Sequence, residues 1–167
     1  MVELMVVVAI AALLMSMAMP SFRSMIQRQK ITTAANDLFA AVNLTRAEAI
    51  GRGLRVDLVP AGDGRDWAKG WIVFIDDNHD QKPDPGEQVI FSHGPVPHEI
   101  NIQSAFTDSK VQYFSYTATG RSRTNSNSQT PQVGSWTLVL DAKVRRIKVN
   151  FLGRARVCNP ETDKTTC

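Results

Sequence analysis

The sequence predicts an α+β fold in which one long N-terminal helix packs on a head of antiparallel β-strands. Three observations support it. Residues 2–19 form an apolar run whose one charged side chain is Glu3. Apolar residues then recur at spacings of three and four, and from residue 54 the period becomes two and turn residues multiply. We expect residues 1–24 to form the first half of the helix, and residues 25–167 to form one head that carries its second half.

The apolar run is predicted to be a retained membrane helix. It has no basic region before it and no small-residue cleavage site after it, unlike a secretory signal peptide. At about 1.5 Å per residue it spans roughly 25 to 27 Å, slightly less than the hydrocarbon core of a bilayer, so we expect residues to be missing before Met1. A charge at the edge of an apolar helix indicates a functional group that awaits a partner, although Glu3 could also reach interfacial water.

The N-terminal residues resemble those of type IV pilins and type II secretion pseudopilins. Val2, Glu3 and Leu4 correspond to the end of the family motif FTLxEL, and Pro20 falls where the family carries a helix-kinking proline. The resemblance implies a type IV pilin-like fold with the first helical half embedded in the bacterial inner membrane and the head in the periplasm, then in an assembled pilus. It also implies a precursor cut by prepilin peptidase, and a Glu3 that neutralises the N-terminal amine of a neighbouring subunit in the filament.

The residues after Pro20 predict a helix with one buried stripe, formed by Ile31, Ala35, Leu38, Val42, Thr45 and Ala49. Gly51 and Gly53 indicate its end. The segment Leu-Thr-Arg-Ala-Glu-Ala-Ile at residues 44–50 resembles the LxRxEAI segment of the FimT/GspH branch of minor pilins and pseudopilins. The alternative for this segment alone is an ordinary amphipathic helix.

The head is predicted to be a single antiparallel β domain with one modest core. Its expected strands are residues 55–59, 70–75, 88–92, 100–104, 111–115, 135–140 and 146–151. Gly, Pro, Asn and Asp separate them, as is typical of antiparallel strands. Residues 119–134, rich in Ser, Asn, Gln and Thr, are expected to form a loop.

The residues Gly-Trp-Ile-Val-Phe at 70–74 resemble the GWxVF strand of FimT/GspH proteins, which runs into an acidic loop. In this chain the loop covers residues 76–87. Its oxygen-bearing side chains follow the spacing of calcium ligands, at Asp76, Asn78, Asp80, Asp84 and Glu87. However, Gln81 stands where such a loop needs Gly, and strands rather than helices flank it. We therefore expect a solvated turn, with no cofactor, and keep calcium as the alternative.

The two cysteines, Cys158 and Cys167, are expected to form a disulfide that closes a small tail loop. Zinc is not expected, because two thiols without CxxC spacing and three scattered histidines do not supply four ligands. The disulfide is predicted to hold the tail locally rather than to support the whole head.

Positive charge is concentrated near the C-terminus, although the net charge is only +3. Between residues 109 and 160 the one acid is Asp141, and basic residues are frequent there. Such one-sided clustering is typical of a face that binds a polyanion, and its alternative is a solvated strand face. The predicted contacts are Gly153, Arg154 and Arg156, with long-range attraction from Lys143, Arg145, Arg146 and Lys148. An extended backbone would place Arg154 and Arg156 on one side, and Gly153 would allow close backbone approach.

The sequence Gly-Arg-Ala-Arg at 153–156, followed by Val157 and Cys158, resembles the GRxR ending of FimT-type minor pilins, which is associated with DNA binding in natural transformation. The resemblance implies a minor pilin that binds DNA non-specifically through phosphates. Two alternatives stay open: a structural minor pilin like FimU that primes pilus assembly, and a type II secretion pseudopilin like GspH. Each implies other pilins or pseudopilins as partners. An enzyme is not expected, since the chain has no recognisable nucleophile and base spacing and no phosphate-binding glycine loop.

Overall fold

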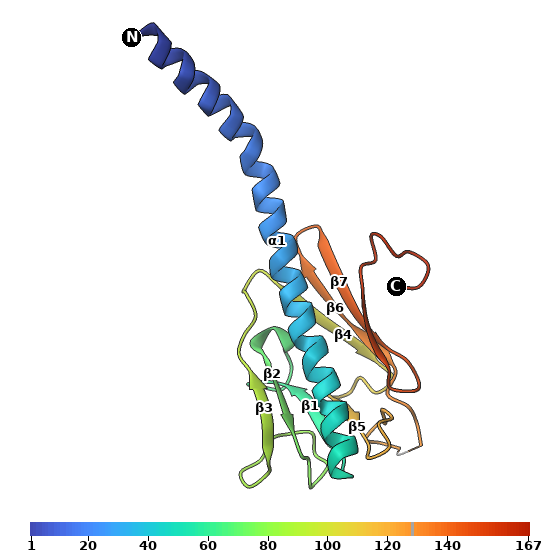
Figure 1. Ribbon diagram of the computed structural model, residues 1–167. Helices are drawn as coiled ribbons and strands as arrows, with labels where there is room; N and C mark the ends of the chain where they lie inside the picture. Colours follow the sequence, from blue (N-terminus) through green and yellow to red (C-terminus); the bar gives the residue numbers. More distant parts are fainter. Residues whose placement is uncertain (128) are drawn as a thin grey trace.

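The long N-terminal helix extends away from the head at its first half and lies against the β-strands at its second half (Figure 1). The computed structural model describes residues 1–127 and 129–167, without the side chains of residues 11–21. Helix α1 (Val2–Arg52) ends where Gly53 adopts a left-handed conformation with φ of 68°. This is the usual role of a glycine after a helix, because it has no Cβ to clash.

The head contains two four-stranded antiparallel sheets. The first sheet has the order β3 (Val89–His93), β2 (Trp71–Phe74), β1 (Val56–Pro60) and β5 (Phe114–Tyr116). The second has the order β4 (Asn101–Phe106), β6 (Gly134–Leu140), β7 (Lys143–Val149) and β8 (Ala155–Cys158). A short 3-10 helix, η1 (Trp67–Lys69), lies between β1 and β2 in the chain. The predicted α+β fold is therefore confirmed.

One hydrophobic core joins the helix to both sheets. The predicted helical stripe is confirmed, since Ile31, Leu38 and Val42 are fully buried and belong to the same cluster as side chains of β1 and β6. Thr45 is also buried and satisfies its hydroxyl by donating to the Ala41 carbonyl at 2.7 Å. Because helix and sheets share this core, the head is one packed unit.

The strand expected at residues 111–115 is shorter and shifted, to Phe114–Tyr116, and two strands near the C-terminus also differ from the prediction. The strand expected at residues 146–151 begins earlier, at Lys143, and ends at Val149. It stops there because residues 150–153 turn back, with the Gly153 N–H donating to the Asn150 carbonyl at 2.9 Å. The chain then forms β8, which pairs with β7 along its length. The GRxR element therefore lies at the start of the second strand of a hairpin.

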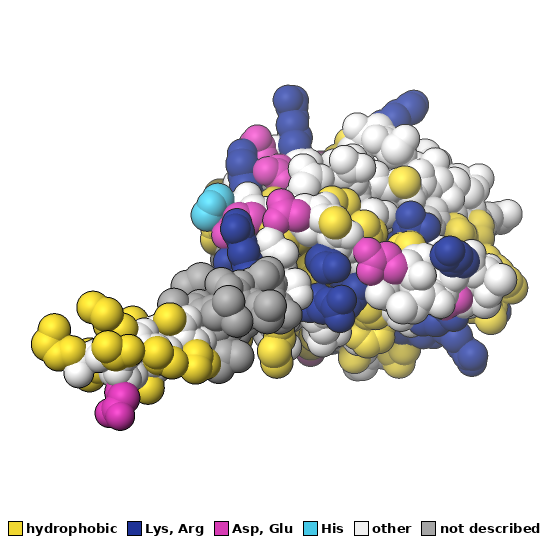
Figure 2. Space-filling view, turned by 90° about the horizontal axis from the view of Figure 1, so that it is seen from above, with side chains coloured by type: hydrophobic (Ala, Val, Ile, Leu, Met, Phe, Trp, Pro, Cys, Tyr) yellow, Lys and Arg dark blue, Asp and Glu magenta, His cyan; other side chains and the backbone are white. Residues whose placement is uncertain are grey.

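The first turns of α1 present apolar side chains to solvent, for example Val2 at 75% and Leu4 at 72% exposure. Figure 2 shows hydrophobic side chains gathered on this free end, whereas charged side chains of both signs are spread over the head. Glu3 lies in the first helical turn and is exposed. Pro20 lies outside the side chains that the structure describes. No helical stretch within the described residues combines the length and the apolarity that crossing a bilayer requires.

Candidate nucleic-acid interface

The turn between β7 and β8 holds the GRxR backbone in a fixed shape. The Asn150 carboxamide oxygen accepts the N–H groups of Leu152 and Arg154, both at 3.0 Å. The Asn150 N–H in turn donates to the Arg154 carbonyl at 3.1 Å. An asparagine that bonds the backbone two and four residues ahead is a typical stabiliser of a tight turn.

Gly153 makes its close approach inside the protein and not toward an external ligand. It is buried, with φ of 75°, and its carbonyl accepts the Tyr116 hydroxyl at 2.7 Å. A Cβ at this position would lie 2.8 Å from a Tyr116 ring carbon and 2.9 Å from the Gly120 carbonyl oxygen. The expected approach of this backbone to a phosphate is therefore corrected: Gly153 anchors the turn to β5 and so positions the arginines that follow.

The basic residues of β7 are divided between the two faces of the second sheet. Lys148 lies directly opposite Arg156 on β8, and Arg146 lies opposite Cys158. Lys143 and Arg145 instead lie opposite Leu140 and Leu138, whose side chains are buried in the core. Because alternate residues of a strand point to opposite faces, only Arg146, Lys148 and Arg156 share the outer face. The four β7 cations that the sequence groups together thus form two separate pairs.

The C-terminal tail folds over the outer cations. The predicted disulfide between Cys158 and Cys167 is present, with Cα atoms 5.7 Å apart. Arg146 donates to the Cys167 carbonyl at 3.0 Å, and Lys148 donates to the Thr166 carbonyl at 3.2 Å. These hydrogen bonds hold the tail against the outer face of the second sheet.

Among the described residues, Arg156 is the outer cation that forms an ion pair with an acid. Its guanidinium donates to the Thr166 carbonyl and to the Thr166 hydroxyl, the latter at 2.8 Å. The carboxylate of Asp163 lies 3.7 Å from the same guanidinium. Thr166 also donates to Asp163, and these hydrogen bonds, with Arg156 and Lys148 nearby, lower the pKa of the Asp163 carboxyl. Asp163 therefore stays charged and partly neutralises Arg156.

Arg154 is exposed, and its guanidinium makes no hydrogen bond or ion pair within the residues that the structure describes. It borders an open groove of about 590 Å³. The groove is lined by Val133, Lys148, Val149, Asn150, Arg154, Ala155 and Arg156. Three of the predicted contacts, Lys148, Arg154 and Arg156, therefore come together around one groove.

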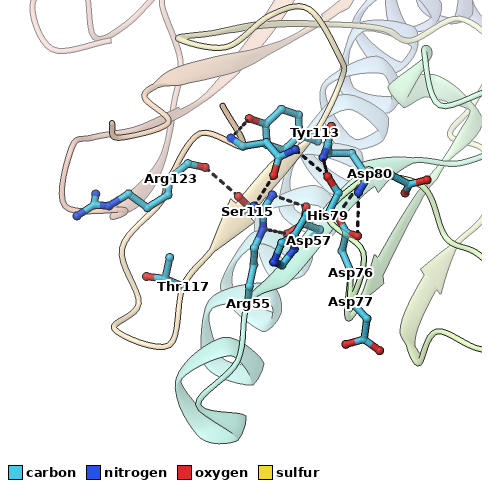
Figure 3. Close-up of polar contacts among 12 residues, drawn as sticks. Arg55, Asp57, Asp76, Asp77, His79, Asp80, Tyr113, Ser115, Thr117 and Arg123 are labelled. Atoms are coloured by element: carbon cyan, nitrogen blue, oxygen red, sulfur yellow. Dashed lines mark hydrogen bonds and ion pairs between the residues drawn. The ribbon is translucent and has the colours of Figure 1, made fainter. Parts of the chain in front are cut away.

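The acidic loop uses its carboxylates to hold its own backbone. The two oxygens of Asp76 accept the N–H groups of Asp80 at 3.2 Å and Gln81 at 3.0 Å, and Figure 3 shows Asp76 and Asp80 side by side. Glu87 accepts from the backbone of Asp77 and Asp84. Within the described residues, no three His, Cys, Asp or Glu side chains gather as a metal site would require. Calcium binding by Asp76, Asn78, Asp80, Asp84 and Glu87 gains no support from this arrangement.

A buried ion pair beside this loop was not predicted. Arg55 donates two hydrogen bonds to Asp57, at 2.7 and 2.8 Å, and a third to Asn125 at 2.6 Å (Figure 3). Asp57 is fully buried, and this burial raises its pKa to about 6, with the neighbouring Asp76 acting in the same direction. The sequence signal was the charged pair at positions 55 and 57 of an otherwise apolar strand.

Comparison with known proteins finds a matching family model and a pilin-like relative. The family model described as Type II transport protein GspH matches residues 34–153. Pilin-like protein PilA1 of Thermus thermophilus is 33% identical over 91 residues, which is 54% of this chain and 55% of PilA1. The chain thus matches about half the length of that curated relative.

Two solved structures share the fold. The type IV minor pilin FimU of Pseudomonas aeruginosa superposes with a TM-score of 0.64 at 17% identity, covering 80% of this chain and 92% of FimU. The minor pseudopilin EpsH from the Type 2 Secretion System of Vibrio cholerae gives 0.56 at 10% identity, covering 78% and 98%. At these identities the likeness concerns the fold alone.

Proposed function

Because the chain belongs to the GspH family of type II transport proteins and has a pilin-like fold, we propose that it is a minor type IV pilin that binds DNA non-specifically during natural transformation. In this proposal the apolar half of α1 anchors the precursor in the inner membrane, prepilin peptidase processes it, and the helix then packs among other pilins. The β7–β8 turn carries the DNA contacts.

The observation that carries the DNA proposal is the free guanidinium of Arg154 beside a groove that Lys148 and Arg156 also line. Exposed cations that converge on one groove suit phosphate oxygens, and each contact releases condensed counterions. Contacts to phosphates carry no sequence information, so the proposed binding is independent of sequence.

The test is a DNA titration of the full chain in detergent at several salt concentrations. Replacing Arg154 and Arg156 together by Gln should weaken binding equally for all sequences. It should also reduce the salt slope by roughly 1.4 to 1.8, at about 0.7 to 0.9 per lost contact. A matched control is the double change of Arg65 and Lys69 to Gln, because both side chains are cations outside the hairpin. Equal binding by the two double variants would remove the GRxR element from the mechanism.

Filament incorporation is proposed to depend on Glu3. Its side chain is exposed, and no other described part of the chain packs over the apolar residues around it. An exposed apolar surface of this kind suits burial by neighbouring subunits. Glu3→Ala should leave the thermal unfolding of the head unchanged but remove the protein from sheared pili. Wild-type amounts of the variant in the sheared fraction would contradict this role.

A secretion role is the second candidate, and the observation that favours it is the family model itself, which describes type II transport proteins. Deletion of the gene in a strain that has both machineries separates the two functions. Loss of DNA uptake with normal secretion supports the pilin. Loss of secretion with normal uptake supports the pseudopilin, and a piliation defect without loss of DNA binding supports a structural minor pilin.

A further inference from the structure

The groove beside Arg154 joins two kinds of surface. Its cations are Lys148, Arg154 and Arg156, whereas Val133 and Ala155 give it an aliphatic wall, behind which Val149 is buried in the core. Val133 is 36% exposed, so part of this wall faces solvent. In a DNA duplex the bases stack inside the helix and the outer surface is mainly charged backbone. An aliphatic wall beside phosphate-binding cations is therefore complementary to nucleotides whose bases are not paired.

An aromatic ring stands at the end of the same hairpin. Phe151 is 64% exposed and occupies the turn between Asn150 and Leu152. The turn cannot bend freely, because Asn150 binds two backbone N–H groups and Gly153 is fixed against Tyr116. A ring on a rigid support loses little conformational entropy when a base stacks on it.

We propose that the hairpin prefers single-stranded DNA, with a base stacked on Phe151 and the flanking phosphates bound by Arg154, Arg156 and Lys148. This preference rests on the proposed DNA-binding function and names its ligand class. Phosphate contacts exist in both single-stranded and duplex DNA, so the arginines alone cannot distinguish them. Phe151 is the residue that determines the preference, since only unpaired bases offer a free face for stacking.

The experiment compares one labelled oligonucleotide of mixed sequence with its own duplex, in titrations of the full chain at several salt concentrations. The wild-type protein should bind the single strand more tightly. Phe151→Ala should weaken single-strand binding by about 5- to 100-fold, the loss expected for one stacked base, with little effect on the duplex and no change in salt slope. Phe151→Tyr keeps the ring and should retain the preference.

Phe91→Ala is the matched control, because Phe91 is also an aromatic residue with an exposed fraction of 38% but lies on β3 of the other sheet. Equal affinity of the wild type for both DNA forms, or an equal loss for both in Phe151→Ala, would overturn the inference while leaving DNA binding in place. Absence of binding to either form would overturn both this inference and the proposed function.

Discussion

The acidic loop at residues 76–87 and the basic hairpin of β7 and β8 both look like ligand sites in the sequence, yet the structure treats their charges differently. Asp76 and Glu87 each accept two backbone N–H groups within the loop. The hairpin cations Arg146 and Lys148 bond carbonyl oxygens in the described tail, and Arg154 bonds none there. The loop uses its carboxylates as internal acceptors, whereas Arg154 of the hairpin keeps its charge facing outward.

The difference arises from the length of the side chains and from whether they accept or donate hydrogen bonds. A carboxylate has a short stem and several acceptor sites, so in a tight turn it meets backbone N–H groups of its own segment. A long basic side chain such as that of Arg154 can instead extend away from its own backbone and present its charge to a ligand. Changes around the loop should therefore alter stability, and changes around the hairpin should alter binding.

The largest expected effect is at the buried pair beside the acidic loop. Arg55→Met should lower the free energy of unfolding by about 3 to 5 kcal/mol, because it leaves Asp57 buried without its counter-charge. Denaturant unfolding measures this loss. Lys69→Met is the control, since Lys69 pairs with Asp63 at an exposed site and should cost about 1 kcal/mol or less. Similar losses in the two variants would show that burial does not make the Arg55–Asp57 pair contribute more to stability than the exposed Lys69–Asp63 pair.

The same pair predicts a pH dependence of stability. Burial raises the pKa of Asp57 to about 6, from an ordinary value of 3.8. Between these pH values the folded protein holds a proton that the unfolded chain has released, so stability should fall as the pH rises toward 6. Two pKa units correspond to roughly 3 kcal/mol. Denaturant unfolding of the wild type and of Asp57→Asn across this range tests it, because the variant should lack the decline. Parallel curves for the two proteins would contradict the assignment.

The helix and most strands could be predicted because periodicity and turn residues are local signals. The division of the β7 cations between two faces could not, because it depends on where the strand begins, and that start is set by the turn at Asp141, with φ of 50°. The contacts of Arg156 with Thr166 and Asp163 depend on the path of a tail that the disulfide fixes. The burial of Gly153 could not be predicted either, because Tyr116, whose hydroxyl donates to the Gly153 carbonyl, lies 37 residues away in the sequence.

Removing the disulfide should change the hairpin more than the core. Replacing Cys158 and Cys167 by Ser should cost about 2 kcal/mol or less, since the sequence separation is only 9 residues. The tail should loosen, and hydrogen exchange should increase in residues 159–167 but not in β6. A fall in the midpoint of thermal unfolding by tens of degrees would show that the tail supports the core, contrary to the local role.

The smallest expected effect concerns the acid that faces Arg156. Asp163→Asn removes the carboxylate that lies 3.7 Å from the guanidinium and keeps a side chain of similar shape. Exposed ion pairs contribute about 0 to 1 kcal/mol, so DNA affinity should rise by up to about 5-fold, and most at low salt. Asp63→Asn is the control for net charge, because Asp63 is exposed and pairs with Lys69 outside the hairpin. If both variants gain equally, the effect belongs to the charge of the whole protein; a gain confined to Asp163→Asn would place the bound DNA at Arg156, on the face that the tail covers.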